Sequence, residues 1–319
     1  MRVVTGEDID RVLTYPALIE ALRDVFRADI AVPPRHHHTI PTAGAPGTLL
    51  LMPAWTKTGE AAAAPYLGCK LVTVFPDNGK ISKPAVLGSY VLMSAATGEP
   101  LAVMDGTVLT RWRTAAASAL AASYLAREDA SHLVMIGAGA LSPHLVRAHA
   151  SVRPIRRVTL WNRTRGRAVQ AAFGLAVGGI EVEVIDDLEA AVREADIVSC
   201  ATLSSEPLVR GKWLKKGAHV DLVGGFTPKM READDDAVRK SRVYVDTRAG
   251  AMKEAGDIVQ PLKSGALKKD TVRGDLFELC RDEVKGRAGA SQITLFKSVG
   301  TALEDLAAAM LVWQGIGAA

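Results

Sequence analysis

The chain has 319 residues, 48% of them hydrophobic and 23% charged, with a formal net charge of +4. That length suits about two domains, each large enough to bury a core. The lysines and arginines are scattered, which argues against a nucleic-acid partner, and neither a run of ~18 apolar residues nor a signal peptide is predicted. The three cysteines (Cys69, Cys200 and Cys280) lack paired spacing, which predicts a cytoplasmic protein with neither a disulfide framework nor a zinc site.

The N-terminal third of the chain is predicted to form an α+β unit. Residues 1–30 place apolar side chains such as Leu18, Leu22 and Phe26 at helical spacing, so we expect one amphipathic helix capped by Thr5 or Asp8. A pair of prolines ends that pattern. Apolar runs bounded by glycine and proline then predict strands at residues 48–55, 66–75, 86–94 and 100–105.

Two segments of this unit carry candidate functional side chains. Arg35 precedes three histidines, His36, His37 and His38, in an extended segment. Neighbouring side chains of a strand point to opposite faces, so the histidines do not converge and we expect no metal site. Lys70 lies within an apolar strand, where its burial is costly unless it faces a partner or a site. The alternative is an edge-strand lysine that faces water.

An alanine-rich helix is predicted from residue 105 to residue 127. Its first turn is expected to contain Arg111 and Arg113. Positive charges there oppose the helix dipole unless an anion compensates them. The two arginines therefore indicate a site for a carboxylate or a phosphate.

A glycine-rich turn follows, in the stretch HLVMIGAGALS at residues 132–142. Gly137 permits the tight turn, Gly139 lets the backbone approach a pyrophosphate, and Ser142 is small enough for close helix–strand packing. Alone the motif is weak, and a purely structural turn is the alternative. Strands and helices alternate after it, which predicts a doubly wound parallel sheet that binds a dinucleotide. We expect the strands at residues 133–136, 158–161, 181–185, 197–201, 218–223 and 243–245, and helices from 143, at 168–173 and at 188–194.

The end of the second strand of this sheet bears on the choice of dinucleotide. An acidic residue there would bind the ribose hydroxyls of NAD. The sequence instead has Asn162, Arg163 and Thr164, and the last two can hold a 2′-phosphate. It therefore favours NADP over NAD, with a merely solvated Arg163 as the alternative.

The C-terminal stretch, from residue 297 through residue 311, is predicted to be another alanine-rich helix. No strand follows it, so we expect it to return and pack on the first domain. The predicted organisation is thus α/β: a domain of the α+β class at residues 1–115, rejoined by 298–319, and a Rossmann-type dinucleotide-binding domain at 116–297.

Motifs along the chain occur in a specific combination. They are GCKLVTVFP at 68–76, DG at 105–106, LT at 109–110, RTAA at 113–116, the glycine turn, NRT at 162–164, FTPKMRE at 226–232, SVG at 298–300 and LEDL at 303–306. In this combination the chain, from about residue 30 to its C-terminus, resembles the ornithine cyclodeaminase/mu-crystallin family. The resemblance implies a homodimer whose chains each contain a substrate-binding and dimerisation domain, here residues 1–115 with 298–319, and a Rossmann domain.

The resemblance also implies roles for particular residues. Arg113 matches the arginine that binds the substrate carboxylate, and Arg35 and Lys70 match positions that face this carboxylate and the reacting nitrogen. The positions expected to contact or border the cofactor are Thr114, Gly137, Ala138, Gly139, Ala140, Leu141, Ser142, Asn162, Arg163, Thr164, Arg167, Thr202, Val223, Gly225 and Val299.

One departure separates branches of the family. Cyclodeaminases and the archaeal alanine dehydrogenase carry a catalytic aspartate where this chain has Phe226, which can neither take a proton nor activate water. The resemblance therefore implies an NAD(P)H-dependent reductase of cyclic ketimine carboxylates, with NADPH preferred, NADH usable and a small cyclic imino acid as substrate.

Three alternatives stay open at this point. The chain could be an alanine- or opine-type amino-acid dehydrogenase, or a genuine ornithine cyclodeaminase. It could also be a non-catalytic protein that binds a small ligand and NADP. Retention of Arg35, Lys70 and Arg113 together argues against the last of these, because a pure binder has no need for both a carboxylate clamp and a nicotinamide.

Overall fold

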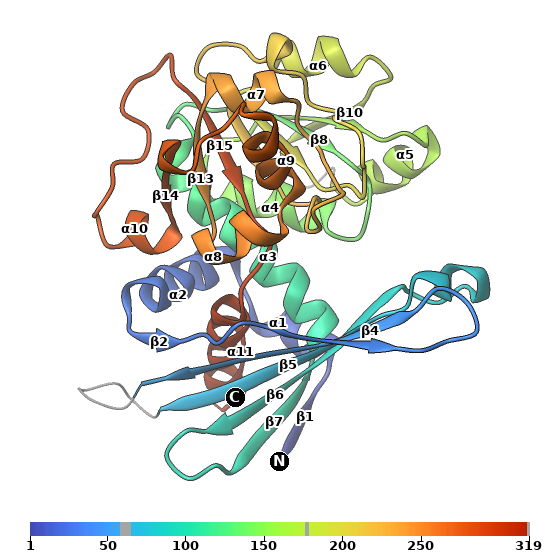
Figure 1. Cartoon of the computed structure of the whole chain (residues 1–319), viewed down its shortest axis with the longest axis vertical. Coiled ribbons are helices and arrows are strands. Elements are labelled where there is room, and N and C mark those ends of the chain that lie inside the picture. Colours follow the sequence, from blue (N-terminus) through green and yellow to red (C-terminus); the bar gives the residue numbers. More distant parts are fainter. Residues whose placement is uncertain (58–64, 176–178, 318–319) are drawn as a thin grey trace. The chain divides into compact units, whose positions relative to one another are not determined.

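The computed structural model describes residues 1–57, 65–175 and 179–317 and has the predicted α/β class (Figure 1). The chain divides into two compact units. One comprises Met1–Arg113 together with Thr301–Ala319, and the other comprises Thr114–Gly300. Across the described residues, no helix combines the length and apolar character needed to cross a membrane.

The N-terminal segment differs from the single helix expected there. It contains β1 (Arg2–Val4), α1 (Gly6–Val12) and α2 (Tyr15–Arg27). The chain is extended at Leu13 and Thr14, and Pro16 lies in the first turn of α2. Proline fits that turn because its missing N–H has no helical partner there, so the second apolar stretch begins a new helix. Thr5 caps α1 in a reciprocal box with Asp8, which accounts for both capping candidates.

The first unit is built on a mostly antiparallel sheet in the order β1-β7-β6-β5-β4-β2, with β3 also paired to β4. Helix α11 (Ala302–Gly317) contacts α2 and the central strands of this sheet. Lys70, Met52, Tyr90 and Met104 stand opposite one another on neighbouring strands, so their side chains share one face of the sheet. The other strands of the sheet are β2 (Ile30–Ala31), β3 (His36–Ile40), β4 (Gly47–Thr56), β5 (Tyr66–Val74), β6 (Val86–Ser94) and β7 (Pro100–Asp105), and the 3₁₀ turn η1 (Pro76–Ile81) lies between β5 and β6.

Helix α3 (Gly106–Leu125) follows β7 directly. The carboxylate of Asp105 accepts hydrogen bonds from the backbone N–H groups of Thr107 and Val108, which begins the helix. Arg111 and Arg113 therefore lie in the second turn, not in the first turn as expected. The influence of the helix dipole fades within the first turn, so the dipole does not explain these arginines.

The second unit is an eight-stranded parallel sheet in the order β10-β9-β8-β11-β12-β15-β13-β14. The order reverses between β8 and β11, which is the switch point of a doubly wound fold. Two of its strands, β14 and β15, were not expected from the sequence. The strands are β8 (His132–Ile136), β9 (Arg157–Trp161), β10 (Glu181–Val184), β11 (Ile197–Cys200), β12 (His219–Leu222), β13 (Ser241–Val245), β14 (Val272–Asp275) and β15 (Ile293–Lys297). The helices are α4 (Ser142–Val152), α5 (Arg165–Phe173), α6 (Leu188–Glu194), α7 (Asp235–Lys240), α8 (Arg248–Glu254), α9 (Gly256–Ser264) and α10 (Leu276–Cys280), with 3₁₀ turns η2 (Gly211–Trp213) and η3 (Lys269–Thr271).

Strand β15 also corrects the expected helix from residue 297. Lys297 ends this strand, and Gly300, with a φ of 80°, reverses the chain before α11 begins at Ala302. The backbone N–H groups of Val299 and Gly300 both donate to Asp246 Oδ2 at 2.7 Å. A left-handed residue and an external acceptor for these N–H groups are incompatible with a helix there.

Candidate functional site

The first unit contains a buried group of charges centred on Asp305. Lys70 lies on the central strand β5 and is 2% exposed, so it is not an edge lysine that faces water. Its Nζ donates to Asp305 Oδ1 at 2.8 Å and to Thr110 Oγ1 at 3.3 Å. Thr110 in turn donates to the carbonyl of Gly106 at 2.6 Å, which fixes its hydroxyl as the acceptor for the lysine.

Arg113 joins the same group from α3. Its Nε donates to Asp305 Oδ1 at 2.9 Å and its Nη1 donates to Glu304 Oε2 at 2.6 Å. Both carboxylates lie at the start of α11, and both are buried. A guanidinium has five N–H groups, so three remain beyond these two bonds for a planar anion such as a carboxylate. Asp305 Oδ2 is buried and has no hydrogen-bond partner among the described residues.

The charges in this group set its proton affinity. Burial, with Arg113 and Arg35 nearby, lowers the pKa of Lys70 from its ordinary 10.5 to about 8, although Asp305 acts in the opposite direction. Burial alone would raise the pKa of Asp305, but the charges of Lys70 and Arg113 bring it below its ordinary value. The group therefore contains a carboxylate that stays ionised and an ammonium that can release its proton near neutral pH.

The sequence pattern located three of these residues and left others out. Arg35, Lys70 and Arg113 were expected at a site, and the charge of Arg35, which lies half-buried between β2 and β3, acts on both Lys70 and Asp305. Glu304 and Asp305 were noted only as part of a motif. The signal for them is physical: two adjacent acids within an apolar helix are costly to bury unless cations meet them.

The second unit contains the glycine-rich turn after β8. Gly137 has a φ of 105°, and a Cβ atom there would lie 2.6 Å from the carbonyl oxygen of Ala201. Gly139 is exposed, with no atom within 4 Å of the position that a Cβ would take, so its backbone is open to a ligand. Helix α4 begins at Ser142, whose hydroxyl donates to the Gly139 carbonyl at 2.7 Å. These residues fit a pyrophosphate.

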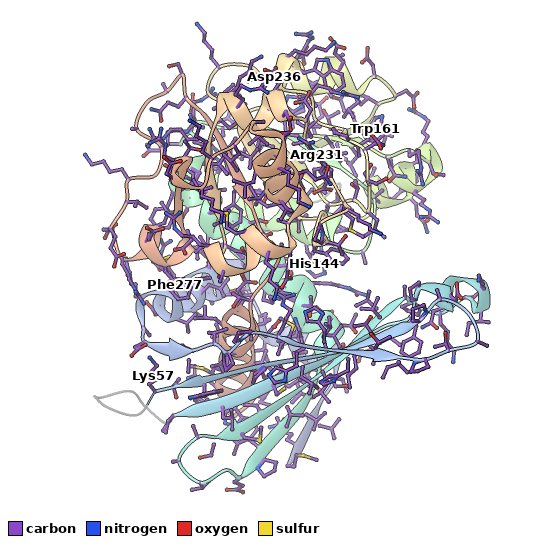
Figure 2. All side chains as sticks on the ribbon, in the orientation of Figure 1. Lys57, His144, Trp161, Arg231, Asp236 and Phe277 are labelled. Atoms are coloured by element: carbon purple, nitrogen blue, oxygen red, sulfur yellow. The ribbon has the colours of Figure 1, made fainter. Side chains whose placement is uncertain are left out.

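The end of β9 lies beside this turn. Trp161, labelled in Figure 2, closes the strand, and Asn162 Oδ1 accepts a hydrogen bond from the Ala138 N–H at 3.2 Å. Arg163, Thr164 and Arg167 are exposed.

The other cofactor candidates are spread over the same unit. Thr202 lies two residues after the end of β11, Val223 directly follows β12, and Val299 lies two residues after the end of β15. Thr114 lies within α3, and Ala140 and Leu141 lie in the glycine-rich turn. Gly225 is buried, and a Cβ there would lie 2.5 Å from Asp257 Oδ2. The close approach of Asp257 therefore requires glycine at position 225, whether or not a cofactor binds there.

The histidine run forms β3. His36 and His38 share one face, with ring centroids 6.4 Å apart, while His37 alternates with them. Among the described residues, no three or more His, Cys, Asp or Glu side chains are grouped so that they could hold a metal ion.

A family model for the ornithine cyclodeaminase/mu-crystallin family matches residues 2–318. The chain belongs to this family. A Delta(1)-pyrroline-2-carboxylate reductase of Colwellia psychrerythraea is 35% identical over 97% of each chain. The Delta(1)-pyrroline-2-carboxylate reductase of Thermococcus litoralis, solved in complex with NADH and L-proline, is 33% identical with a TM-score of 0.92 over 100% of this chain and 98% of that chain. An archaeal alanine dehydrogenase dimer with bound NAD is 28% identical with a TM-score of 0.90, over 100% of this chain and 96% of the other.

Phe226, the residue that follows Gly225, is the position at which the sequence departs from the pattern expected of cyclodeaminases. Phe226 directly follows the turn after β12 and is 39% exposed. An apolar side chain therefore stands where the resemblance to cyclodeaminases predicts an aspartate. It supplies no base at this position.

Proposed function

We propose that this protein is an NAD(P)H-dependent reductase of cyclic ketimine carboxylates. It converts Δ1-pyrroline-2-carboxylate to L-proline and Δ1-piperideine-2-carboxylate to L-pipecolate. The observation that carries the proposal is the buried group in which Lys70 and Arg113 share Asp305. Support comes from the relatives that are named for this reaction.

Each residue of the group has a task in this chemistry. A bound nicotinamide supplies a hydride to the imine carbon, and the nitrogen takes a proton, so that the C=N bond becomes a C–N single bond with an N–H. Arg113, assisted by Arg35, holds the substrate carboxylate and thereby fixes the distance of the imine carbon. Lys70 supplies positive charge beside the nitrogen or the proton itself, which its pKa of about 8 permits. Asp305 keeps both cations in place.

Phe226 favours reduction over cyclodeamination. Cyclodeamination of ornithine requires a base that takes a proton from an amine, and reduction of a preformed ring imine does not. Because the position carries an apolar side chain, we infer that ornithine is not a substrate. An open-chain amination would also need ammonia to be activated, and Phe226 provides no group for that.

The cofactor that we propose is NADPH in preference to NADH. The exposed side chains Arg163, Thr164 and Arg167 follow β9, where the 2′-phosphate of NADPH would lie in a doubly wound fold. Arg165, which lies on α5 together with Arg167, is paired with Asp186 at 2.9 Å. Arg163 and Arg167 are therefore the cations that we assign to the 2′-phosphate.

We propose a homodimer that forms through the face of the first unit's sheet opposite Lys70. Strand registers place Val3, Trp55, Leu71 and Leu87 on this face. All four are more than one-third exposed, an apolar surface of the kind that a partner covers. The relative solved as a dimer supports this assignment. Sedimentation of the wild type and of Leu71→Asp tests it, with a monomeric variant expected and a monomeric wild type contradicting it.

The experiment for the proposed activity follows NADPH and, separately, NADH in the presence of Δ1-pyrroline-2-carboxylate or Δ1-piperideine-2-carboxylate. Pyruvate with ammonia serves as the open-chain control, and NAD with L-ornithine tests cyclodeamination. We expect rapid oxidation of NADPH or NADH with the two cyclic imines, and no reaction in the pyruvate or ornithine assays. Turnover of ornithine to proline and ammonia would contradict the inference from Phe226, and inertness toward every imine would leave a binding protein.

A further inference from the structure

A second buried carboxylate connects two loops of the Rossmann unit. Glu232 is 0% exposed. Its Oε1 accepts hydrogen bonds from the backbone N–H and the hydroxyl of Thr202, at 2.6 and 2.8 Å. Its Oε2 accepts from the backbone N–H of Gly224 at 2.8 Å. One side chain thus uses both oxygens to hold backbone from two separate loops.

These two loops lie at the edge of the sheet where a dinucleotide binds. Thr202 follows β11 and Gly224 follows β12, and the two strands are parallel neighbours. In a doubly wound sheet, ligands bind at the carboxyl ends of the strands. The half after the switch point, which here begins with β11 and β12, receives the nicotinamide nucleotide. The loops that Glu232 holds are therefore those of the nicotinamide half.

The loops are also in close mutual contact. A Cβ atom on Gly224 would lie 1.9 Å from the carbonyl oxygen of Thr202. A Cβ on Gly137 would lie 2.6 Å from the carbonyl oxygen of Ala201 and 3.2 Å from the Thr202 side chain. A shift of Thr202 would consequently reach both the loop after β12 and the glycine-rich turn.

Glu232 is itself fixed by a second layer of charges. Asp257 Oδ1 accepts the backbone N–H groups of Glu232 and Ala233 at 2.8 and 2.9 Å. Lys297 Nζ lies 3.6 Å from Asp257 Oδ2 and donates to the carbonyl of Leu222 at 3.0 Å. Lys297 ends β15 and Leu222 ends β12, so the charges of this layer connect the ends of two strands to the carboxylate of Asp257.

The surroundings place the proton equilibrium of Glu232 near neutrality. Burial raises its pKa from 4.5 to about 7, Lys297 opposes this rise, and Asp257 adds to it. The Cys200 thiol also faces this carboxylate, and its own burial together with Glu232 raises its pKa well above the ordinary value, so it stays neutral. Above pH 7 the carboxylate offers acceptors on both oxygens, and below it one oxygen carries a proton.

We propose that Glu232 is a positioning residue for the cofactor: its ionised carboxylate holds the loops of Thr202 and Gly224 in the arrangement that receives the nicotinamide nucleotide. The inference rests on the proposed function, because it takes a nicotinamide dinucleotide as the ligand. It requires cofactor affinity to fall as the carboxylate is protonated or replaced by an amide, since an amide NH₂ cannot accept the Gly224 N–H.

The test measures NADH binding by fluorescence without any substrate, across a range from about pH 6 to about pH 8.5. NADH is the probe because it lacks the 2′-phosphate of NADPH, which titrates in this range. We expect the Kd of the wild type to rise toward low pH with a midpoint near 7. Glu232→Gln should bind about tenfold more weakly at the upper end, the size of effect expected for one buried donor left without its acceptor, and should lose this pH dependence. Glu206→Gln, which changes an exposed carboxylate near the same loop, should match the wild type.

A second variant, Glu232→Asp, keeps the proposal testable if Glu232→Gln fails to fold. It keeps a titrating carboxylate on a shorter side chain, so we expect weaker binding with the pH dependence retained. A purely structural role would lower the melting temperature without moving the pH profile of binding. A flat wild-type profile together with unchanged affinity in Glu232→Gln would overturn the inference. Failure of the wild type to bind either NADH or NADPH would instead overturn the proposed function.

Discussion

The buried charges around Asp305 in the first unit and those around Glu232 in the second unit are built differently. In the first unit, Lys70 and Arg113 surround the carboxylate of Asp305, and every contact joins one charged side chain to another or to Thr110. In the second unit, Glu232 directs both oxygens at backbone and hydroxyl groups of loops. The first arrangement pairs its cations with carboxylates, and Arg113 has more N–H groups than its two bonds to these carboxylates use, which suits an anionic ligand. In the second arrangement, both carboxylate oxygens accept hydrogen bonds from the protein itself, which suits a role in positioning loops.

The largest effect on this comparison is expected from a variant in which residue 113 keeps its positive charge but loses the planar guanidinium. For Arg113→Lys we expect kcat/KM for the cyclic imine to fall about 10²–10³-fold, because an ammonium cannot hold a carboxylate in two-point contact and a misplaced substrate reacts slowly. Binding of NADH should stay unchanged. Steady-state kinetics and fluorescence binding measure the two effects.

The matched control for this variant is Arg111→Lys, two residues away on α3. We expect nearly wild-type kinetics from it. Equal losses in the two variants would mean that α3 tolerates no lysine there and that Arg113 has no special part in binding the substrate.

Asp305→Asn should have the next largest effect. It leaves two buried cations with only Glu304 as a charged partner from α11, so we expect a loss of about 3 kcal/mol in the free energy of unfolding. Because Asp305 raises the pKa of Lys70, its removal should also shift the alkaline limb of kcat/KM to lower pH. Urea unfolding and a pH–rate profile measure these changes. Asp24→Asn, at an exposed position of α2, should produce neither.

The wild type should itself show the proton equilibrium of Lys70. With the cofactor saturating at every pH, we expect kcat/KM for the cyclic imine to be level below about pH 8 and to fall about tenfold per pH unit above it, because the neutral amine supplies neither charge nor proton. The sign for stability is opposite. A pKa that is lower in the folded state than the ordinary 10.5 means that protonated Lys70 opposes folding, and that this penalty is relieved as pH rises from about 8 toward 10.5. A profile that stays level through pH 9 would show that another group delivers the proton.

The smallest effect is expected at the exposed edge of the Rossmann unit. Replacement of both Arg163 and Arg167 by serine should weaken NADPH binding about tenfold and leave NADH binding within about twofold, because only NADPH carries the 2′-phosphate. The ratio of the two Kd values is the measurement. Arg156→Ser, an exposed change in the loop before β9, is the control. An equal loss for both cofactors would assign these arginines to another part of the nucleotide.

The sequence was most informative where a pattern is local. Strand–helix alternation and the Gly137 turn predicted the doubly wound sheet, and Thr5 and Asp8 predicted a helix start, since these signals depend on residues close in the chain. Strands β14 and β15 were missed. Each is only four or five residues long, and β15 enters the sheet between β12 and β13, out of chain order. A short apolar run carries no mark of where in a sheet it pairs.

The buried group of charges around Asp305, which we propose binds the substrate, was predictable only in part for a related reason. Lys70 and Arg113 stood out because a charge within an apolar strand or a small-residue helix is costly. The partner that sets their protonation, Asp305, comes from the other end of the chain. Likewise, nothing local to Glu232 indicates that it would hold Thr202, thirty residues earlier. Contacts at such separations depend on the completed fold.

The separation of Lys70 and Asp305 by 235 residues has a consequence for biosynthesis. A ribosome adds about 5–20 residues per second, so roughly 10–50 s pass between the synthesis of one partner and that of the other. The entire span Thr114–Gly300 emerges in that interval and has a compact core of its own. Until α11 arrives, the face of the sheet that carries Lys70 lacks the helix that packs on it. The proposed substrate site is therefore the last part of the molecule to be completed. A nascent chain that stops before Ala302 has the glycine-rich turn without Asp305, the carboxylate that pairs with Lys70.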